Sequence, residues 1–206
     1  MGINERKERE KEELQKSILT AAREVFLEKG FDQTSIRSIA QKIEYSPTTI
    51  YLYYKDKDAI LYALHTEGFQ LLTSKMEVLT SVENPFERLK AMGRIYLQFA
   101  MDYSDYYDLM FVQNSPMHKL DEDDETWKEG MGAFEGLRWT IEQCIEQNYL
   151  PFGDAEVGAY MVWSAMHGMI NLYDRGRCKV VDEQKRENIV ELAFSEFLKL
   201  LDAFSR

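Results

Sequence analysis

The most informative pattern in this chain lies at residues 35–57, which read SIRSIAQKIEYSPTTIYLYYKDK. Ser35 stands where a helix N-cap is expected, because its hydroxyl can accept a backbone N–H that the first turn leaves unpaired. Apolar residues then recur at the i, i+3, i+4, i+7 spacing of a helix with one buried face: Ile36, Ile39, Ala40 and Ile43. The spacing therefore predicts a helix of two to three turns.

A second helix is predicted after a break at Glu44 and Tyr45. Ser46 can cap it, and Pro47 occupies the first helical position, where its missing N–H costs nothing. Ile50 and Tyr54 lie four residues apart and can pack back on the first helix. Four side chains are then directed mostly outward, with Tyr51 at the margin: Thr48, Thr49, Leu52 and Tyr53. Short hydroxyls, an aromatic ring and a leucine suit base edges, thymine methyl groups and phosphate oxygens, so we interpret this unit as a helix-turn-helix.

The same residues resemble the DNA-binding signature of the tetracycline-repressor (TetR) family over about residues 14–64. The likeness is carried by residues 35–40 and 49–57, with Tyr51, Tyr54 and Lys57 at the family's tyrosine, aromatic and lysine positions. Taken singly, these residues would equally fit an ordinary helical hairpin with a polar rim.

Three positions depart from the family pattern. Glu44 and Thr48 stand where glycine is common, and Tyr53 stands where histidine is common. A residue other than glycine at a left-handed turn costs on the order of 1 kcal/mol, so we expect a turn that is strained but formed.

The resemblance also implies roles for individual side chains. We expect bases or methyl groups to be read by Thr48, Thr49, Leu52 and Tyr53. We expect phosphates to be held mainly by Ser35, Arg37, Tyr51 and Lys57. Ser46 and Pro47, which begin the helix, also belong to the predicted DNA-binding site.

The distribution of charge is compatible with a DNA partner. The chain of 206 residues has a formal net charge of −11, but 11 of its 25 basic and 11 of its 36 acidic residues lie in residues 1–60. The acidic excess therefore belongs to residues 61–206. A local cationic face can be supplied by Arg37, Lys42, Lys55 and Lys57.

Several function classes have little support in the sequence. No apolar run reaches the roughly 18 residues of a membrane-spanning helix, and the charged N-terminus does not resemble a secretory signal, so we expect a cytoplasmic protein with no membrane partner. Cys144 and Cys178 form no C-x-x-C pair, and His65, His118 and His167 share no ligand spacing. We expect no metal, no cofactor and no catalytic residues; His167 beside Ser164 is the only hint of an enzyme.

The fold is expected to be all-α with about nine helices. Residues 1–58 are predicted to form a three-helix DNA-binding domain, in which residues 1–13 are either a helical extension laced by ion pairs or a fraying tail, and Gly30 ends the first helix in the left-handed region. Residues 59–206 are predicted to form a larger helical domain for effector binding and dimerisation. Further helices are predicted over residues 57–80, 85–102, 104–112, 126–147, 154–173 and 182–204, with an acidic loop at 121–125.

Methionine, aromatic and a few polar side chains recur on two faces of the predicted interior helices. Such residues are often simply core, but together they fit a small-molecule cavity with few polar groups. The predicted pocket consists of Met92, Tyr96, Phe99, Tyr103, Met110, Trp127, Met131, Phe134, Arg138, Tyr160, Trp163, His167 and Asn171. Arg138 or His167 suits a carboxylate and the aromatic rings equally suit a lipophilic cation, so the charge of the effector stays open.

The last predicted helix has an apolar stripe wider than one intramolecular contact usually needs, so the last two helices are candidates for a four-helix dimer interface. The alternative is that the stripe is used fully inside its own subunit. The family resemblance implies the same interface, and it implies two recognition helices about one DNA turn apart. In addition, Trp163, His167 and Gly168 resemble the W-x-x-x-H-G motif of one group of TetR-family C-terminal domains.

The resemblance to the TetR family implies a homodimeric transcriptional repressor that leaves its DNA operator when a small, largely apolar effector binds. The alternative is a ligand-binding or scaffold protein whose helix-turn-helix no longer binds DNA.

Overall fold

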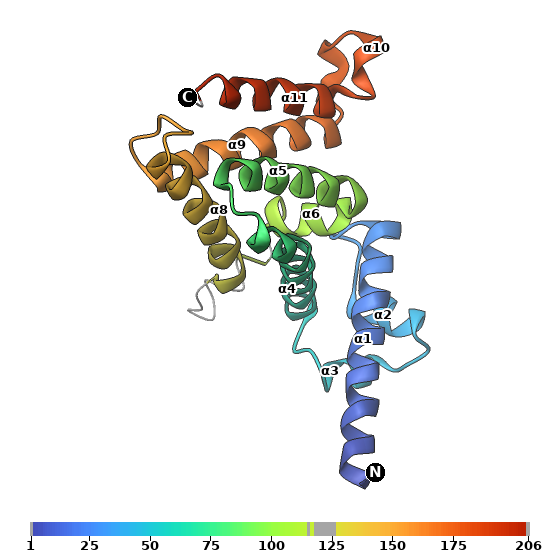
Figure 1. The fold of residues 1–206 in the computed structure, drawn as a ribbon. Coiled ribbons are helices and arrows are strands. Elements are labelled where there is room, and N and C mark those ends of the chain that lie inside the picture. The colour runs from blue at the N-terminus through green and yellow to red at the C-terminus, as the bar shows by residue number, and fades with distance from the viewer. Residues whose placement is uncertain (1, 115, 118–126, 205–206) are drawn as a thin grey trace. The chain divides into compact units, whose positions relative to one another are not determined.

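The computed structural model describes residues 2–114, 116–117 and 127–204, and these residues form helices and connecting turns without a strand. Ten α-helices and two short 3₁₀ helices are present in these ranges, which confirms the predicted all-α class (Figure 1). The predicted acidic loop at 121–125 and the predicted helix start at residue 126 lie outside the described residues.

The chain divides into two compact units. Unit 1 comprises Met1–Gln70 and Tyr103–Trp127, and unit 2 comprises Leu71–Asp102 and Lys128–Arg206. These units do not follow the predicted domains at residues 1–58 and 59–206, because part of α4 and all of α6 group with the N-terminal helices. The functional division at residue 58 stays a prediction.

Unit 1 begins with the long helix α1 (Ile3–Lys29). Its first turns are charged and exposed, and they carry i, i+4 ion pairs such as Arg6 with Glu10 at 2.8 Å. Of the two alternatives predicted for residues 1–13, this is the helical extension with ion pairs. The helix ends before Gly30, whose φ of 79° favours glycine. Its ψ of 169° lies outside the left-handed helical region that was predicted. Phe31 folds back on Phe26, and the two ring centroids lie 4.5 Å apart.

The helices α2 (Ile36–Lys42) and α3 (Pro47–Tyr51) follow with the predicted caps. The Ser35 hydroxyl accepts a hydrogen bond from the Ser38 N–H, and the Ser46 hydroxyl accepts one from the Thr49 N–H at 3.1 Å. Glu44, in the turn between the helices, has a φ of 60°. The strained turn that the sequence predicted is therefore present.

Helix α4 (Lys57–Met76) begins at Asp56, whose carboxylate accepts a hydrogen bond from the Ala59 N–H at 2.7 Å. It passes from unit 1 into unit 2, because the boundary between the units lies after Gln70. The predicted α-helix to residue 80 is too long, since residues 77–81 form the 3₁₀ helix η1 (Glu77–Ser81). The hydroxyls of Thr80 and Ser81 bond back to the carbonyls three residues earlier, which competes with a regular α-helical turn.

Unit 1 is completed by α6 (Ser104–Phe111), which buries Tyr106, Tyr107, Leu109 and Met110. The close approach of α6 to α4 requires a glycine at Gly68. A Cβ built there would lie 2.6 Å from Met110 Sδ, well inside van der Waals contact.

Unit 2 contains α5 (Pro85–Asp102), α8 (Lys128–Glu146), α9 (Ala155–Asp174) and α11 (Ile189–Asp202). Helix α9 contacts α5, α8 and α11 (Figure 1). Its fully buried stripe is Ala159, Val162, Met166 and Ile170, a face that the sequence analysis did not select. The core around this stripe includes Phe86, Leu89, Ile141, Cys144 and Leu201.

The predicted last helix over residues 182–204 is wrong in its first part. The chain instead forms η2 (Arg177–Val180), a short α10 (Glu183–Arg186) and then α11. Arg186 turns its guanidinium back to the carbonyls of Val181 and Lys179, and the Asn188 N–H bonds to Lys185 in a tight turn. These bonds end α10 before α11 can continue it.

Candidate nucleic-acid interface and effector site

Helix α3 presents the side chains that were predicted to read DNA. Ile50 is fully buried and α3 packs on α2, which fixes the orientation of the short helix. Tyr51 in its last turn is 56% exposed, and Leu52 at its C-cap is 78% exposed. An exposed aliphatic side chain can pack on thymine methyl groups, so Leu52 is a candidate for contact with a groove.

The hydroxyl groups near α3 divide into two sets. Ser46 and Thr49 hydroxyls lie 2.9 Å apart and are engaged in the helix cap, and Thr49 is half-buried. Thr48 is exposed, and Tyr53 is half-buried. The exposed reading surface is therefore centred on Thr48, Tyr51 and Leu52.

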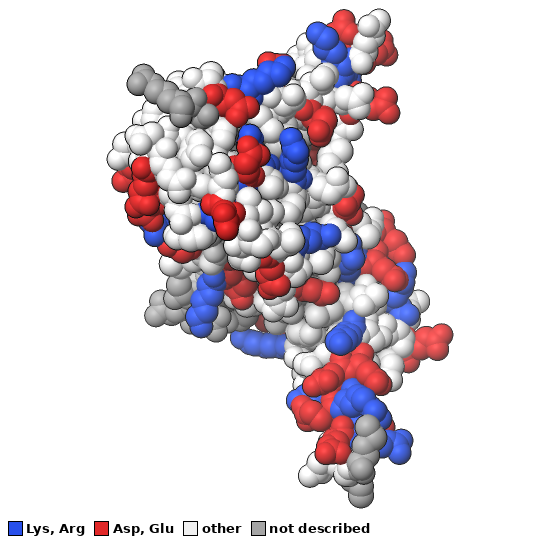
Figure 2. Space-filling view, viewed as in Figure 1, with Lys and Arg blue, Asp and Glu red and all other residues white. Residues whose placement is uncertain are grey.

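The predicted cationic face is smaller than the sequence indicated. Lys42 pairs with Glu28 at 2.6 Å and with Glu24 at 3.0 Å on α1, and the hydrogen bond to Glu28 is the main cause that raises its pKa. The Lys57 ammonium donates to the Phe31 carbonyl at 3.1 Å, which leaves two of its three N–H donors. Arg37 and Lys55 are exposed. On the face shown in Figure 2, basic and acidic side chains alternate over the N-terminal turns of α1 rather than forming a continuous basic surface.

Several of the predicted effector residues meet around Trp163 in unit 2. Its indole N–H donates to the Tyr96 hydroxyl at 3.2 Å, and its ring centroid lies 6.2 Å from that of Phe134. Tyr160 and His167 on the same helix lie at 6.2 and 6.1 Å. Burial lowers the pKa of His167, so its imidazole is held neutral at pH 7. We call Tyr96, Phe134, Tyr160, Trp163 and His167 the Trp163 cluster.

The other predicted pocket residues of unit 2 differ in how far they are buried. Phe99 is fully buried, and Met92 and Asn171 are half-buried in unit 2. Met131 and Tyr160 are 58% and 61% exposed, so the described chain does not enclose them. Arg138 was expected to be available for a carboxylate, but its guanidinium bonds to Glu135 and lies 3.5 Å from Glu142. The hydrogen bond to Glu135 is the main cause that raises its pKa.

Three predicted pocket residues belong to unit 1 instead. Tyr103 begins α6, Met110 packs against Gly68, and the Trp127 indole N–H donates to His65 Nε2 at 3.2 Å. His65 is itself fully buried and its ring stacks with that of Tyr62. These side chains build the interior of unit 1.

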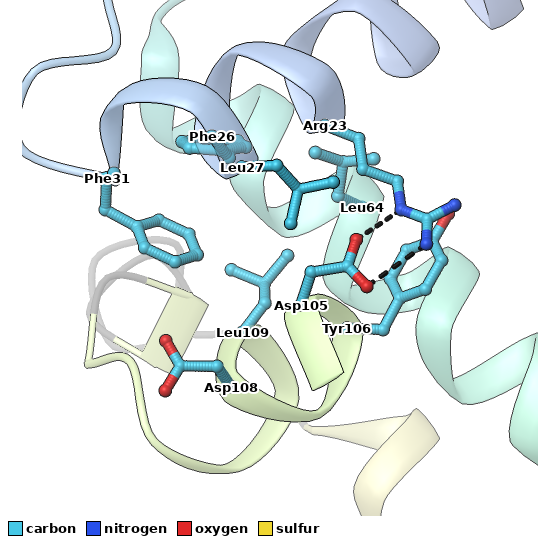
Figure 3. Close-up of a pocket in the computed structure, with 10 residues that line it drawn as sticks. Arg23, Phe26, Leu27, Phe31, Leu64, Asp105, Tyr106, Asp108 and Leu109 are labelled. Atoms are coloured by element: carbon cyan, nitrogen blue, oxygen red, sulfur yellow. Dashed lines mark hydrogen bonds and ion pairs between the residues drawn. The ribbon is translucent and has the colours of Figure 1, made fainter. Parts of the chain in front are cut away.

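The sequence analysis missed a cavity of about 250 Å³ in unit 1, between α1, α4 and α6 (Figure 3). Arg23 and Asp105 form an ion pair at its edge although they are 82 residues apart in the chain. No local motif signals a pair of that separation. Among the described residues, no group of three or more His, Cys, Asp or Glu side chains is placed to hold a metal ion, and no helix is both long and apolar enough to span a membrane.

Both parts of the chain match known protein families. Residues 18–64 match the family described as bacterial regulatory proteins, tetR family, and residues 89–197 match the family described as the tetracyclin repressor-like C-terminal domain. The second match alone covers more than half of the chain. The chain belongs to the TetR family of bacterial regulatory proteins. The finer likeness to the W-x-x-x-H-G group stays a prediction.

Two curated relatives come from Bacillus subtilis. One, named Fatty acid metabolism regulator protein, is 35% identical over 87 residues, which is 42% of each chain. The other, named as the HTH-type transcriptional regulator YuxN, is 21% identical over 104 residues, or 50% of this chain and 36% of the relative. The matched regions thus span less than half of the length of these relatives.

Solved structures share the fold over nearly the whole chain. A TetR-family regulator from Syntrophomonas wolfei is 21% identical, with a TM-score of 0.71 over 94% of this chain and 96% of the other. The regulator FadR from Bacillus subtilis, solved with stearoyl-CoA, is 20% identical with a TM-score of 0.66 over 87% and 97% of the two chains.

Proposed function

We propose that this TetR-family regulator is a homodimeric repressor that binds a two-fold symmetric DNA operator through α3. The observation that carries this proposal is the geometry of α3. Ile50 is completely buried, while Tyr51 in the last turn of α3 and Leu52 at its C-cap are left in solvent. Short polar, aromatic and methyl-bearing side chains on one exposed turn are suited to the major groove.

Two helices of unit 2 support the proposed dimer. In the single chain, α9 leaves Val157, Met161 and Leu172 more than half exposed, and α11 leaves Leu192 and Leu200 exposed at 46% and 55%. Exposed apolar side chains on two helices that pack on each other are suited to cover by a partner. A second copy of the same two helices gives the isologous contact that a palindromic operator requires.

We further propose that the effector binds at the Trp163 cluster. The cluster offers aromatic surface, two tyrosine hydroxyls and a neutral imidazole, which favours an apolar molecule with a modest polar head. The names of two relatives, a fatty acid metabolism regulator and a FadR solved with stearoyl-CoA, support fatty acids or their thioesters as the first class to test. Helix α4 runs from unit 1 into unit 2 and is the continuous element through which occupancy would alter α3.

Selection of DNA ligands from a random-sequence library, with the full chain, tests the proposal. The expected result is an enriched inverted repeat with half-sites about one helical turn, ~34–36 Å, apart. Adding oleoyl- or stearoyl-CoA should then lower the affinity by about 5- to 150-fold. Enrichment of no sequence would contradict repression, whereas an enriched site that is insensitive to both thioesters would contradict only the effector class.

One observation favours the alternative, a helical ligand-binding protein without DNA affinity. Two of the four predicted basic residues are engaged within unit 1, since Lys42 pairs with Glu28 and Lys57 donates to the Phe31 carbonyl. Glu44 also adds an acidic side chain at the turn. If the alternative holds, titration of bulk duplex DNA at low salt should show no binding, because even nonspecific affinity depends on free cations.

A further inference from the structure

Arg88 is a buried cation of unit 2 that the proposed function does not use. It lies in the first turn of α5, and only 6% of its surface is exposed. Burying a charge costs free energy unless partners compensate it. In the part of the chain that the structure describes, no carboxylate pairs with this guanidinium, and its hydrogen-bond acceptors are all neutral. A planar guanidinium held in this way fixes the geometry of the groups around it.

The three acceptors of Arg88 belong to two elements that are far apart in the chain. Nη1 donates to the backbone carbonyl of Val82 at 3.0 Å, and Nη2 donates to Gln143 Oε1. Nε donates to Thr140 Oγ1 at 3.4 Å. Val82 directly follows η1, whereas Thr140 and Gln143 lie about one turn apart on α8. Arg88 therefore joins the end of η1 to α8.

Neighbouring groups of α8 hold the guanidinium in this position. The Thr140 hydroxyl donates to the Gly136 carbonyl at 3.0 Å, which leaves its oxygen lone pairs to accept from Arg88. The guanidinium carbon lies 4.4 Å from the centre of the Trp139 ring, so one face of the cation is covered by an aromatic surface. Arg88 is thus seated on α8 by two hydrogen bonds and one ring.

The two joined elements have different roles in the proposed function. Helix α8 carries Phe134 of the Trp163 cluster, which lies roughly 9 Å along the helix axis from Thr140. The 3₁₀ helix η1 directly continues α4, which ends at Met76. The Val82 N–H donates to the Leu79 carbonyl at 3.0 Å, so the carbonyl that Arg88 holds belongs to the residue that closes η1.

We propose that Arg88 is the positioning residue through which α8 controls η1 and, with it, the C-terminal part of α4. A shift of α8 moves Thr140 and Gln143, and the rigid guanidinium passes this movement to the Val82 carbonyl. The link consists only of residues of unit 2. Its consequence, that effector binding at the Trp163 cluster reaches α4 by way of Arg88, rests on the proposed function.

A double-mutant cycle on amide hydrogen exchange, measured by NMR on the full chain, tests the link without DNA or effector. Gln143→Leu removes one acceptor on α8 and keeps a side chain of similar size. Because this loosens the hold of Arg88 on η1, the Val82 amide should exchange about 3- to 10-fold faster. The Gly176 amide, which bonds to the Tyr173 carbonyl at 2.9 Å after α9, should exchange as before.

The second arm of the cycle removes Arg88. In an Arg88→Met background, Gln143→Leu should change exchange at Val82 by less than about 1.5-fold, because the connection is already lost. Arg94→Met, at an exposed position of α5, is the matched control, and in this background Gln143→Leu should act as it does in the unmodified chain. Should Arg88→Met fail to fold, Gln147→Leu at an exposed site after α8 keeps the test decisive: it should leave the Val82 amide unchanged, whereas Gln143→Leu accelerates it.

The proposed function supplies a second readout. Arg88→Met should bind the selected operator within about threefold of the unmodified chain. The factor by which stearoyl-CoA lowers operator affinity should fall by at least about fivefold in this variant. A purely structural role of Arg88 would weaken the fold and leave that factor unchanged.

Three results would overturn the proposal. The first is an unchanged exchange rate of the Val82 amide in Gln143→Leu, and the second is the same acceleration by Gln143→Leu with and without Arg88. The third is an unmodified chain that responds to stearoyl-CoA and an Arg88→Met variant that responds equally. If the unmodified chain binds no operator, the proposed function fails, and the exchange cycle still decides whether Arg88 forms the link.

Discussion

Glu44 is a non-glycine residue in the turn between the two helices of the helix-turn-helix, and its φ of 60° lies in the left-handed region. A residue with a Cβ costs about 1–2 kcal/mol in that conformation. Glycine avoids this strain but loses about 0.5–1 kcal/mol more conformational entropy on folding. We therefore predict that Glu44→Gly raises the free energy of unfolding by about 0.5–1 kcal/mol.

Thermal unfolding followed by calorimetry measures this change. For a chain of this size, each kcal/mol corresponds to about 2–4 °C in Tm, so Glu44→Gly should raise Tm by about 1–4 °C. Glu44→Ala removes the same charge but keeps a Cβ, and it should give no increase. Asn148 is a second non-glycine residue in this region, with a φ of 61°. Asn148→Gly should raise Tm by less than Glu44→Gly does, because asparagine tolerates the left-handed region better than glutamate.

Two results would refute this reasoning. If Glu44→Ala raises Tm as much as Glu44→Gly, the charge of Glu44 rather than its backbone conformation is responsible. If Glu44→Gly leaves Tm unchanged while Asn148→Gly raises it, the turn after α2 is not strained as the structure describes.

Two further predictions concern packing and pH. Gly68→Ala puts a Cβ 2.6 Å from Met110 Sδ, whereas the Cβ of Gly136→Ala on α8 meets nothing within 4 Å. In urea unfolding, Gly68→Ala should be about 1–3 kcal/mol less stable than Gly136→Ala. Equal stability of the two variants would contradict the close crossing of α4 and α6. Burial lowers the pKa of His167, so this side chain binds a proton less readily in the folded chain than in the unfolded chain. Stability is therefore lost as the pH falls from the ordinary histidine pKa of about 6.5 through the lowered pKa. Removing the imidazole with His167→Gln should flatten the dependence of Tm on pH between about 7 and 5, and an unchanged slope would show that another group titrates.

Local signals in the sequence were sufficient for most helix boundaries. Ser35 and Ser46 each cap the helix that they were expected to cap, and the helices predicted to begin at residues 57, 85 and 154 begin at Lys57, Pro85 and Ala155. These features depend on one to three neighbouring residues, which is why the sequence reveals them. The strained Glu44 turn was predictable for the same reason.

Features that depend on distant residues were not predictable in this way. The buried stripe of α9 could not be selected from the sequence, because apolar residues occur all around that helix and its partners on α5 and α8 decide which face is covered. The break before α11 depends on the Arg186 side chain reaching back to carbonyls five and seven residues earlier. The pairing of Arg23 with Asp105 depends on the packing within unit 1.

The central claim is that the exposed side of α3 reads DNA, and the affinity of Leu52→Ala for the selected operator tests it most directly. Leu52 is 78% exposed, so the substitution should change the stability of the free chain by less than about 0.5 kcal/mol. We predict that Leu52→Ala weakens operator binding by about tenfold or more, while the control Val78→Ala, at a site that is 66% exposed, binds as the unmodified chain does. Operator binding by Leu52→Ala that equals that of the unmodified chain would contradict the account.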